Sequence, residues 1–181
     1  LDSKDILART DAAVHVAHAF TVHPLSTEVD FFTVVDDLKE AHEDAGAAHA
    51  GDMELGAGLF YGYVVVDVPL LVSNLEGGDR KEWSSKDRAL AAEVVRRLAH
   101  LIPTVSPGAK LGSTAPYAYS HFMLAEWGKA QPRTLANAFD KPVRAHGDVL
   151  ASAYDALAEY VTDVDGAYGK KTERRCLAVR P

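Results

Sequence analysis

The sequence predicts an α/β (α+β) fold in which helices pack on one face of a sheet. Two observations carry this prediction. Segments with apolar residues at every second position alternate with segments that show helical spacing, and Pro or Gly separates most of them. The resulting order of strand, long excursion, strand, helix, strand, helix, strand is typical of a split β-α-β arrangement. With 181 residues, 48% of them apolar and 25% charged, the chain has the composition of an ordinary globular domain.

The first predicted strand spans residues 13–23, where apolar side chains alternate with smaller or polar ones. Its alanines also permit a helix, which stays open as the competing interpretation. Residues 1–10 are polar and are predicted to be loose. Residues 24–56 form a long excursion, which contains the apolar cluster Val29, Phe31, Phe32, Val34 and Val35 and then a polar stretch. Connections of this length are usually functional or disordered.

Residues 56–68 form the strongest predicted strand, which Pro69 ends because proline cannot donate to a sheet ladder. A short helix is predicted over residues 70–76, stopped by the glycines that follow. Ser84 and Asp87 have the spacing of a capping box, so a second helix is expected to follow and to run to about residue 102, where prolines stop it. The core face of that helix would consist of Leu90, Val94, Leu98 and Leu101.

The C-terminal part contains three more predicted elements. Strands are expected over residues 117–126 and 174–179. Between them, residues 132–142 form a connection, and Asp148 caps a helix that is expected to end near Val161. One side of this helix carries Leu150, Tyr154, Leu157 and Val161.

The charge and cysteine content narrow the class of protein. Nineteen Lys and Arg residues against 26 Asp and Glu give a net charge of −7, which argues mildly against a free-standing nucleic-acid binder, although local charge decides such binding. The single cysteine, Cys176, excludes an internal disulfide and a cysteine-based zinc site, and suits a reducing cytoplasm. No apolar run is long enough for a membrane helix. The start at Leu1 rather than Met indicates a fragment or a processed product.

Candidate catalytic and metal-binding residues are few. His15, His18 and His23 are close in sequence, but on a strand His15 and His18 face opposite sides, and on a helix they lack the HExxH pattern that supplies a base. Cys176 has no activating neighbour, and no GxSxG, Walker-type or dinucleotide-binding motif occurs. We therefore expect no metal, no cofactor and no enzymatic activity. A small metal hydrolase that uses the histidines is the third-ranked alternative.

The apolar cluster of the excursion has two interpretations. It is either a folded-back loop or third core strand, or the tip of a projecting hairpin that carries apolar side chains to a partner or pushes between stacked bases. Gly56 and Gly58 near the next strand indicate a bulge or a close backbone approach. Lys110 lies in a flexible loop with nearby hydroxyls, which suits either a phosphate contact or a solvated lysine, and the same holds for Lys141 and Arg144.

Several blocks of the sequence match one known family. Two are specific, DAAVHVAHAFTVH over residues 11–23 and DFFTVVDDL over residues 30–38. Shorter ones are GLFY at 58–61 with Tyr63, PGAK at 107–110, NAF with KPV over 137–143, and Gly166 with Tyr168 and Gly169. From Asp11 onward the chain thus resembles CasC, the backbone subunit family of the type I-E CRISPR Cascade complex.

The resemblance implies an RRM-like, ferredoxin-like palm formed by residues 11–23 and 57–181, with a thumb hairpin inserted over residues 24–56. It implies a non-catalytic, cytoplasmic subunit that oligomerises along the CRISPR RNA (crRNA). Target DNA paired to the crRNA and other Cascade subunits would be further partners, and no membrane is involved. The thumb wedge of the family, which flips out a nucleotide at regular intervals, falls on Phe32, Thr33 and Val35, and Lys110 would contact phosphate.

The chain also departs from this family. Family members are considerably longer, and their N-terminal half carries the first palm strand and a basic segment that grips RNA. Nothing in residues 1–10 matches these features, so we expect an incomplete palm that binds RNA poorly by itself. The alternative function is an α/β protein-interaction module whose apolar hairpin tip docks a protein partner without RNA.

Overall fold

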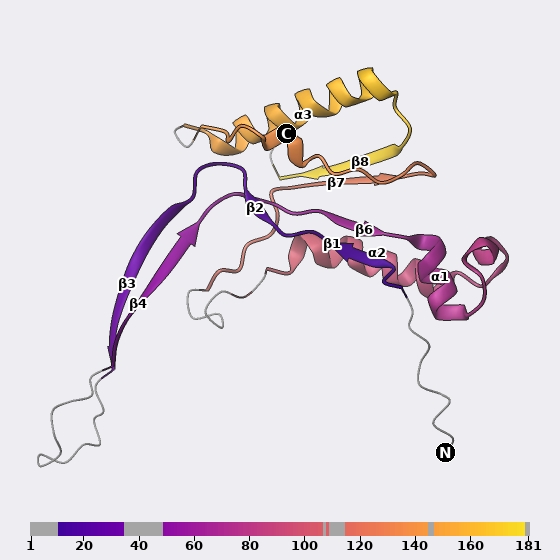
Figure 1. Cartoon of the computed structure of the whole chain (residues 1–181), viewed down its shortest axis with the longest axis horizontal. Coiled ribbons are helices and arrows are strands. Elements are labelled where there is room, and N and C mark those ends of the chain that lie inside the picture. The colour runs from indigo at the N-terminus through magenta and orange to yellow at the C-terminus, as the bar shows by residue number, and fades with distance from the viewer. Residues whose placement is uncertain (1–10, 35–48, 107, 109–114, 145–146, 180–181) are drawn as a thin grey trace, which may run out of the picture. The chain divides into compact units, whose positions relative to one another are not determined.

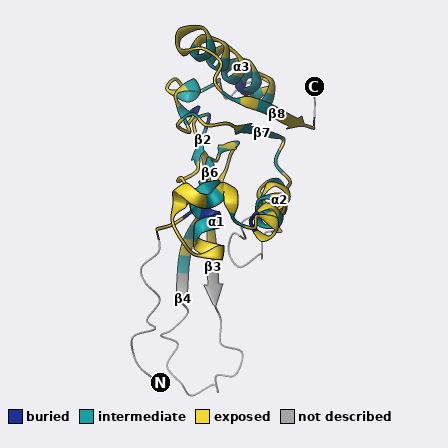
Figure 2. Cartoon of the chain, turned by 90° about the vertical axis from the view of Figure 1, so that its right-hand side faces the viewer, coloured by how far each residue is buried: buried dark blue, intermediate teal, exposed yellow. Residues whose placement is uncertain are grey.

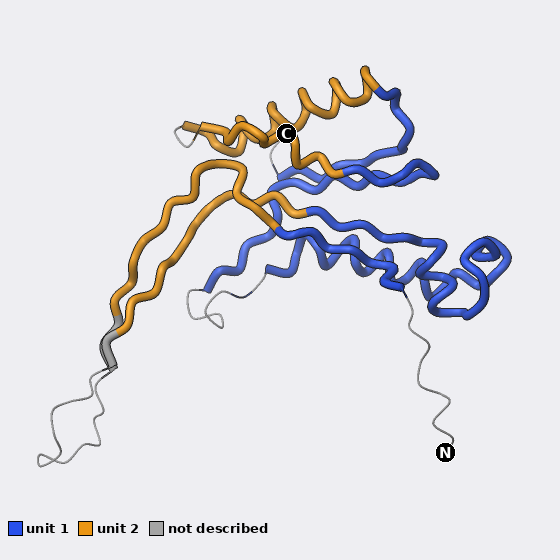
Figure 3. The backbone as a smooth tube through the Cα atoms, in the orientation of Figure 1, with its two compact units in different colours: residues 1–18, 63–133, 168–181 blue, residues 19–62, 134–167 orange. Residues whose placement is uncertain are grey.

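The structure, a computed structural model, describes residues 11–34, 49–106, 108, 115–144 and 147–179 (Figure 1). The chain forms two compact units (Figure 3). The first comprises residues 1–18, 63–133 and 168–181, and the second residues 19–62 and 134–167. Both units combine helix with two-stranded antiparallel sheets, which confirms the predicted α+β class.

The first unit opens on a short sheet. β1 (Val14–Val16) pairs antiparallel with β6 (Val64–Val66). A hydrogen bond from Ala17 N–H to the carbonyl O of Tyr63 (2.9 Å) extends the ladder at one end. The strand expected over residues 13–23 is therefore confirmed at its beginning, and the competing helix is wrong there.

Asp67 joins this sheet to the next helix, α1 (Val68–Glu76). Its N–H donates to the carbonyl O of Ala13 (2.8 Å), and its Oδ1 accepts from a backbone N–H of the first helical turn (3.0 Å) as the N-cap. Its Oδ2 pairs with the first residue of the 3₁₀ helix η1 (Arg80–Ser85) at 2.6 Å. α1 ends at Gly77, whose φ of 73° lies in the left-handed region, so the predicted helix and its glycine stop are confirmed.

α2 (Ala89–Thr104) begins later than the sequence suggested. Ser84 lies within η1 and caps no helix, whereas Asp87 Oδ1 accepts from Ala89 N–H at 2.9 Å. The predicted capping box is therefore wrong. Pro103 lies inside the last turn instead of ending the helix, because a proline there removes only one helical hydrogen bond.

The core of the first unit is small, and α2 presents an unexpected face to it. Ala91 is buried, with Val94 and Val95 packed beside it, whereas Leu90 of the predicted face is 53% exposed. Figure 2 shows α2 with exposed and intermediate residues along its ribbon. The sequence periodicity is therefore confirmed only in part. The buried cluster consists of Ala13, Leu71, Val72 and Ala91.

The second sheet of the first unit pairs β7 (Phe122–Trp127) with β8 (Glu173–Ala178), antiparallel, with Glu126 opposite Arg174. Both strands were expected, although β7 begins later than predicted. Glu126 Oε1 accepts from the Thr172 hydroxyl (3.0 Å) and pairs with Arg174 (2.9 Å). This half-buried carboxylate ties the two strands together near one end of the sheet.

In the second unit, β2 (Phe20–Thr21) pairs with β5 (Phe60–Tyr61), and β3 (Ser26–Val34) pairs with β4 (His49–Ala57). The single strand expected over residues 56–68 is thus divided among the end of β4, β5 and β6. Gly58 and Gly62 stand at the two interruptions. Glycine weakens a strand because it has no side chain to pack.

The helical part of the second unit follows η3 (Ala136–Phe139) and consists of α3 (Val149–Tyr168), whose last residue falls in the first unit. Asp148 Oδ1 accepts from Ala151 N–H at 3.0 Å, so the predicted cap is confirmed. α3 runs past the expected end, through Gly166, and stops where Gly169 takes a φ of 76°. Its predicted apolar side is half-buried, and Ala153 is buried among these residues.

Val72 is fully buried in the core of the first unit, so a substitution at this position tests the assignment of that core. We expect Val72→Ala to lower the free energy of unfolding by about 2 kcal/mol, through lost apolar contacts and the cavity left behind. Urea unfolding measures this, and Val16→Ala, at an exposed position of β1, is the control and should change stability by less than about 0.5 kcal/mol. Equal effects of the two substitutions would contradict the assignment of the core.

Candidate nucleic-acid interface

The β3–β4 hairpin is the longest sheet element in the described part of the chain (Figure 1). Its nine residue pairs run from Ser26 opposite Ala57 to Val34 opposite His49. On β3, the side chain of Val29 is 55% exposed and that of Phe31 is 80% exposed. For Val29 and Phe31 the interpretation as part of a third core strand is therefore wrong, because both side chains stand in solvent on a two-stranded ribbon.

The register divides the stem of the hairpin into two faces of similar chemistry. On one face, Val29 and Phe31 lie opposite Glu54 and Asp52. On the other face, Glu28 and Asp30 lie opposite Leu55 and Met53. Each face thus combines an apolar row with an acidic row, because cross-strand partners share a face. Neither strand contains Lys or Arg, so the stem is suited to a basic or apolar protein surface more than to phosphate.

Two of the predicted wedge residues, Phe32 and Thr33, are consecutive residues of β3. Phe32 lies opposite Gly51, and Thr33 lies opposite Ala50. Val35 and Lys110, the other predicted contacts, lie outside the described residues. The loop cations Lys141 and Arg144 are exposed.

The base of the hairpin is irregular. From the Phe20–Tyr61 pair to the Ser26–Ala57 pair, one strand advances six residues and the other four. His23, within the longer segment, compensates for the interrupted ladder. Its Nε2 accepts from Leu59 N–H (2.9 Å) and its Nδ1–H donates to the carbonyl O of Pro24 (2.8 Å). Nε2 therefore links the two segments, whereas the Nδ1 contact with the following residue fixes the orientation of the ring.

Glycine allows the backbone at this base to lie close to side chains of the opposite segment. A Cβ added to Gly58 would lie 2.8 Å from Thr21 Cγ2, and one added to Gly56 would lie 3.2 Å from Leu25 Cδ2. The close backbone approach expected at these glycines is confirmed. The extra residues of the bulge lie on the opposite segment, between Phe20 and Ser26.

An aromatic cluster supports the same base. The ring of Tyr61 lies 5.4 Å from that of Phe20 and 5.7 Å from that of Phe139, measured between centroids. The Tyr61 hydroxyl accepts from Leu135 N–H (3.0 Å). This cluster was not predicted from the sequence, although the NAF block at 137–139 was a signal. The contacts fix the segment that precedes η3 and η3 itself to the start of the hairpin.

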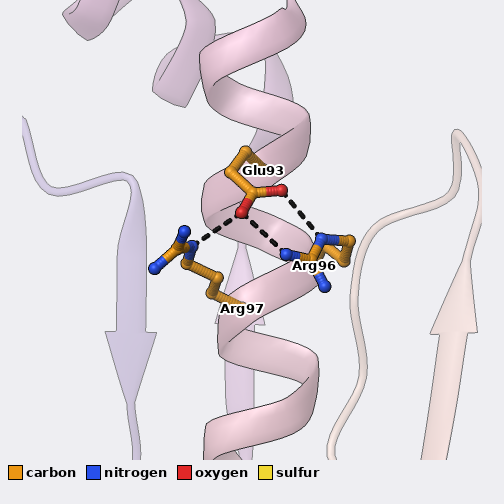
Figure 4. Close-up of polar contacts among 3 residues, drawn as sticks. All are labelled: Glu93, Arg96 and Arg97. Atoms are coloured by element: carbon orange, nitrogen blue, oxygen red, sulfur yellow. Dashed lines mark hydrogen bonds and ion pairs between the residues drawn. The ribbon is translucent and has the colours of Figure 1, made fainter.

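One group of exposed charges on the first unit, on α2, is paired within the chain. On α2, the carboxylate of Glu93 accepts from Arg96 Nε and Nη2 and from Arg97 Nε, each at 2.7 Å (Figure 4). Hydrogen bonds from Arg96 and then Arg97 lower the pKa of Glu93, and Glu93 raises the pKa of Arg96. Such exposed pairs add little to stability.

The histidines and the cysteine singled out in the sequence are separated in the described part of the chain. Within these ranges, no three histidine, cysteine or carboxylate side chains lie close enough to hold a metal ion. His15 is exposed on β1, and Cys176 is an exposed thiol on β8. None of the helices described combines the length and apolar content needed to cross a membrane.

The fold defines an α+β protein of the ferredoxin-like, RRM-like class that carries a long antiparallel hairpin. The sequence model of the CT1975-like protein family matches residues 3–181, and the chain belongs to this family. No curated protein matches it.

Solved structures that are similar to the chain include the following two. One, titled "CRISPR RNA-guided surveillance complex", is 29% identical with a TM-score of 0.73, over 94% of this chain and 61% of that chain. Another, titled "CRISPR RNA-guided surveillance complex, pre-nicking", is 26% identical with a TM-score of 0.76, over 94% of this chain and 44% of that chain. The chain thus spans less than two thirds of either, and its resemblance to CRISPR surveillance subunits is confirmed at this level.

Gly58 provides a test of the hairpin base. We expect Gly58→Ala to lower the free energy of unfolding by about 1–2 kcal/mol, because its Cβ would collide with Thr21 Cγ2. Gly62→Ala is the matched control, since nothing lies within 4 Å of its added Cβ. Thermal unfolding of both variants measures the difference, and equal midpoints would contradict the close approach at Gly58.

Proposed function

We propose that this chain is part of a non-catalytic, RNA-binding backbone subunit of a type I-E CRISPR surveillance complex, of the CasC kind, acting in the cytoplasm. Several copies would line up along the crRNA, which pairs with target DNA. Residues 11–23 and 57–181 would belong to the palm, and residues 24–56 would form the thumb. The tip of the thumb, with Phe32, Thr33 and Val35, would push between nucleotides, and Lys110 would contact phosphate.

The β3–β4 hairpin is the observation that carries this proposal. A two-stranded ribbon with Phe31 and Val29 in solvent gains nothing from the chain's own core, and exposed apolar clusters mark interaction sites. Apolar side chains at such a tip can also separate stacked bases, at a cost of a few kcal/mol per step, when the bent nucleic acid gains further contacts.

The exposed face of α2 supports assembly with other chains or with further parts of the subunit. Leu90, Leu101 and Ile102 are each about half exposed, and Val105 follows them. A helix that leaves its apolar stripe in solvent is suited to a partner surface. The chain spans 61% of one similar structure and 44% of the other, which agrees with a partner surface that lies outside this chain.

A protein-interaction module is the second candidate, and one observation favours it. The stem of the hairpin carries Glu28, Asp30, Asp52 and Glu54 without a basic residue. This charge would repel phosphate and attract a basic protein surface. In that function the hairpin would dock a protein partner and no RNA would be bound.

The wedge can be tested by truncating its apolar side chains in the full-length protein. We expect Phe32→Ala with Val35→Ala to loosen the crRNA-bound filament, because nucleotides are no longer held apart at the tip. Electron microscopy of assemblies on a fixed crRNA measures filament length, and target-DNA binding is the second readout. Leu75→Ala, an exposed apolar truncation on α1, is the control. If filament length and target-DNA binding were both unchanged, the assignment of these residues as a wedge would be wrong.

Binding to single-stranded RNA separates the two candidate functions. We expect the full-length protein to retain a short RNA with a slope of log K against log salt of about −2 or steeper, since each phosphate contact on a single strand contributes about −0.7. Fluorescence anisotropy over a range of salt concentrations measures it. Failure to retain RNA at low salt would favour the protein-interaction module.

A further inference from the structure

The pairing of β7 with β8 gathers positive charge from separate parts of the sequence. Six cations come together at the end of this sheet where β7 stops and β8 starts: Lys129, Arg133, Lys170, Lys171, Arg174 and Arg175. Gly128 fixes this arrangement, because its added Cβ would lie 3.2 Å from the carbonyl O of Lys171. Lys129 and Lys171 are therefore held on neighbouring backbone segments. We call these six residues the basic cluster.

The basic cluster contains an inner and an outer part. The carboxylate of Glu126 holds the two inner arginines, Arg174 at 2.9 Å and Arg133 at 3.5 Å, and all three side chains are largely buried. The four outer cations, on Lys129, Lys170, Lys171 and Arg175, belong to exposed residues. Glu126 neutralises part of the inner charge, and the outer charge faces solvent.

Trp127 gives the cluster an aromatic surface. It ends β7 opposite Glu173 and is 50% exposed. Arg175, which lies opposite Ala125, shares its face of the sheet and is its diagonal neighbour. An exposed indole beside a guanidinium group is the combination on which nucleic-acid bases stack while phosphates are neutralised.

The charge of the cluster contrasts with the rest of the chain. Its six cations are accompanied by two carboxylates, Glu126 and Glu173, which gives +4, whereas the whole chain carries −7. The remainder therefore carries −11. A positive patch on an acidic protein concentrates the attraction for an anionic ligand at one place and keeps that ligand from other surfaces.

From these observations we propose that the end of the β7–β8 sheet is a second nucleic-acid site, separate from the hairpin. It binds the phosphate backbone of a single strand through Lys129, Lys170, Lys171 and Arg175, and Trp127 stacks on a base. This inference rests on the proposed RNA-binding function and adds a site to it. Because RNA and DNA strands share the phosphodiester chemistry, the experiment compares both.

The test removes two outer charges from the full-length protein. We expect Lys170→Gln with Lys171→Gln to make the salt slope of binding shallower by about 1.4, two contacts of about 0.7 each, which corresponds to about 25-fold weaker binding at 0.1 M salt. Fluorescence anisotropy with a single-stranded RNA and a DNA of the same sequence measures both quantities. The strand that loses more affinity is the one the site holds.

A matched control removes the same charge elsewhere in the same unit. Lys81→Gln with Lys86→Gln, on and just after η1, should leave the slope unchanged. Trp127→Ala should weaken binding at least about five-fold, and Trp127→Phe should restore most of it, because stacking needs only an aromatic face. Unfolding midpoints of all variants identify any substitution that acts through stability.

Each remaining outcome decides against the site in a different way. If the wild-type protein binds RNA and the Lys170–Lys171 variant binds with the same slope, the second site is wrong and the proposed function stands. If neither protein binds RNA or DNA, both the proposed function and the second site are wrong. If the variant loses self-association in sedimentation while its nucleic-acid binding is unchanged, the cluster is a contact for the acidic hairpin of a second copy, and the nucleic-acid site is overturned.

Discussion

Antiparallel pairing between residues 14–34 and residues 49–66 is the constraint on which both units depend. It forms β1–β6 in the first unit and both β2–β5 and β3–β4 in the second. A ribbon with few buried side chains is held mainly by its ladder, because each backbone N–H and C=O needs a partner. The side chains that matter for the hairpin are therefore those at its base, where His23 replaces a ladder acceptor for Leu59 and the Tyr61 cluster fixes η3.

Local patterns predicted an element well where the signal for it is contained in a short segment of the sequence. The Asp148 cap is a contact within three residues, and the signals for β1 and β8 each lie within one short segment, although their partner strands are distant. All three predictions are confirmed. The start of α2 and its buried face were predicted wrongly. Helical periodicity places Leu90 and Leu101 on one stripe, but it does not say whether this chain or a partner covers that stripe. In this chain the core instead covers the face that carries Ala91.

The candidate site was likewise predicted only in part. The composition of residues 24–56 left a folded-back loop, a core strand and a projecting hairpin open, and the family resemblance implied the hairpin, with which the exposed Phe31 agrees. The register could not be read from composition, because it depends on the irregular base, where the glycine at 58 approaches Thr21. The basic cluster was missed because it combines two segments that only the β7–β8 pairing brings together. Four cations within residues 170–175 were the signal that could have found its larger part.

The net charge of −7 is the sum of the charges on surfaces that differ in sign. The stem of the hairpin is acidic on both faces, and the end of the β7–β8 sheet is basic. If the stem crossed an RNA backbone closely, its four carboxylates would oppose binding, so only the tip is suited to enter between nucleotides. The negative total therefore agrees with an RNA-binding function when phosphate contacts are confined to a small basic surface and the hairpin supplies an apolar wedge.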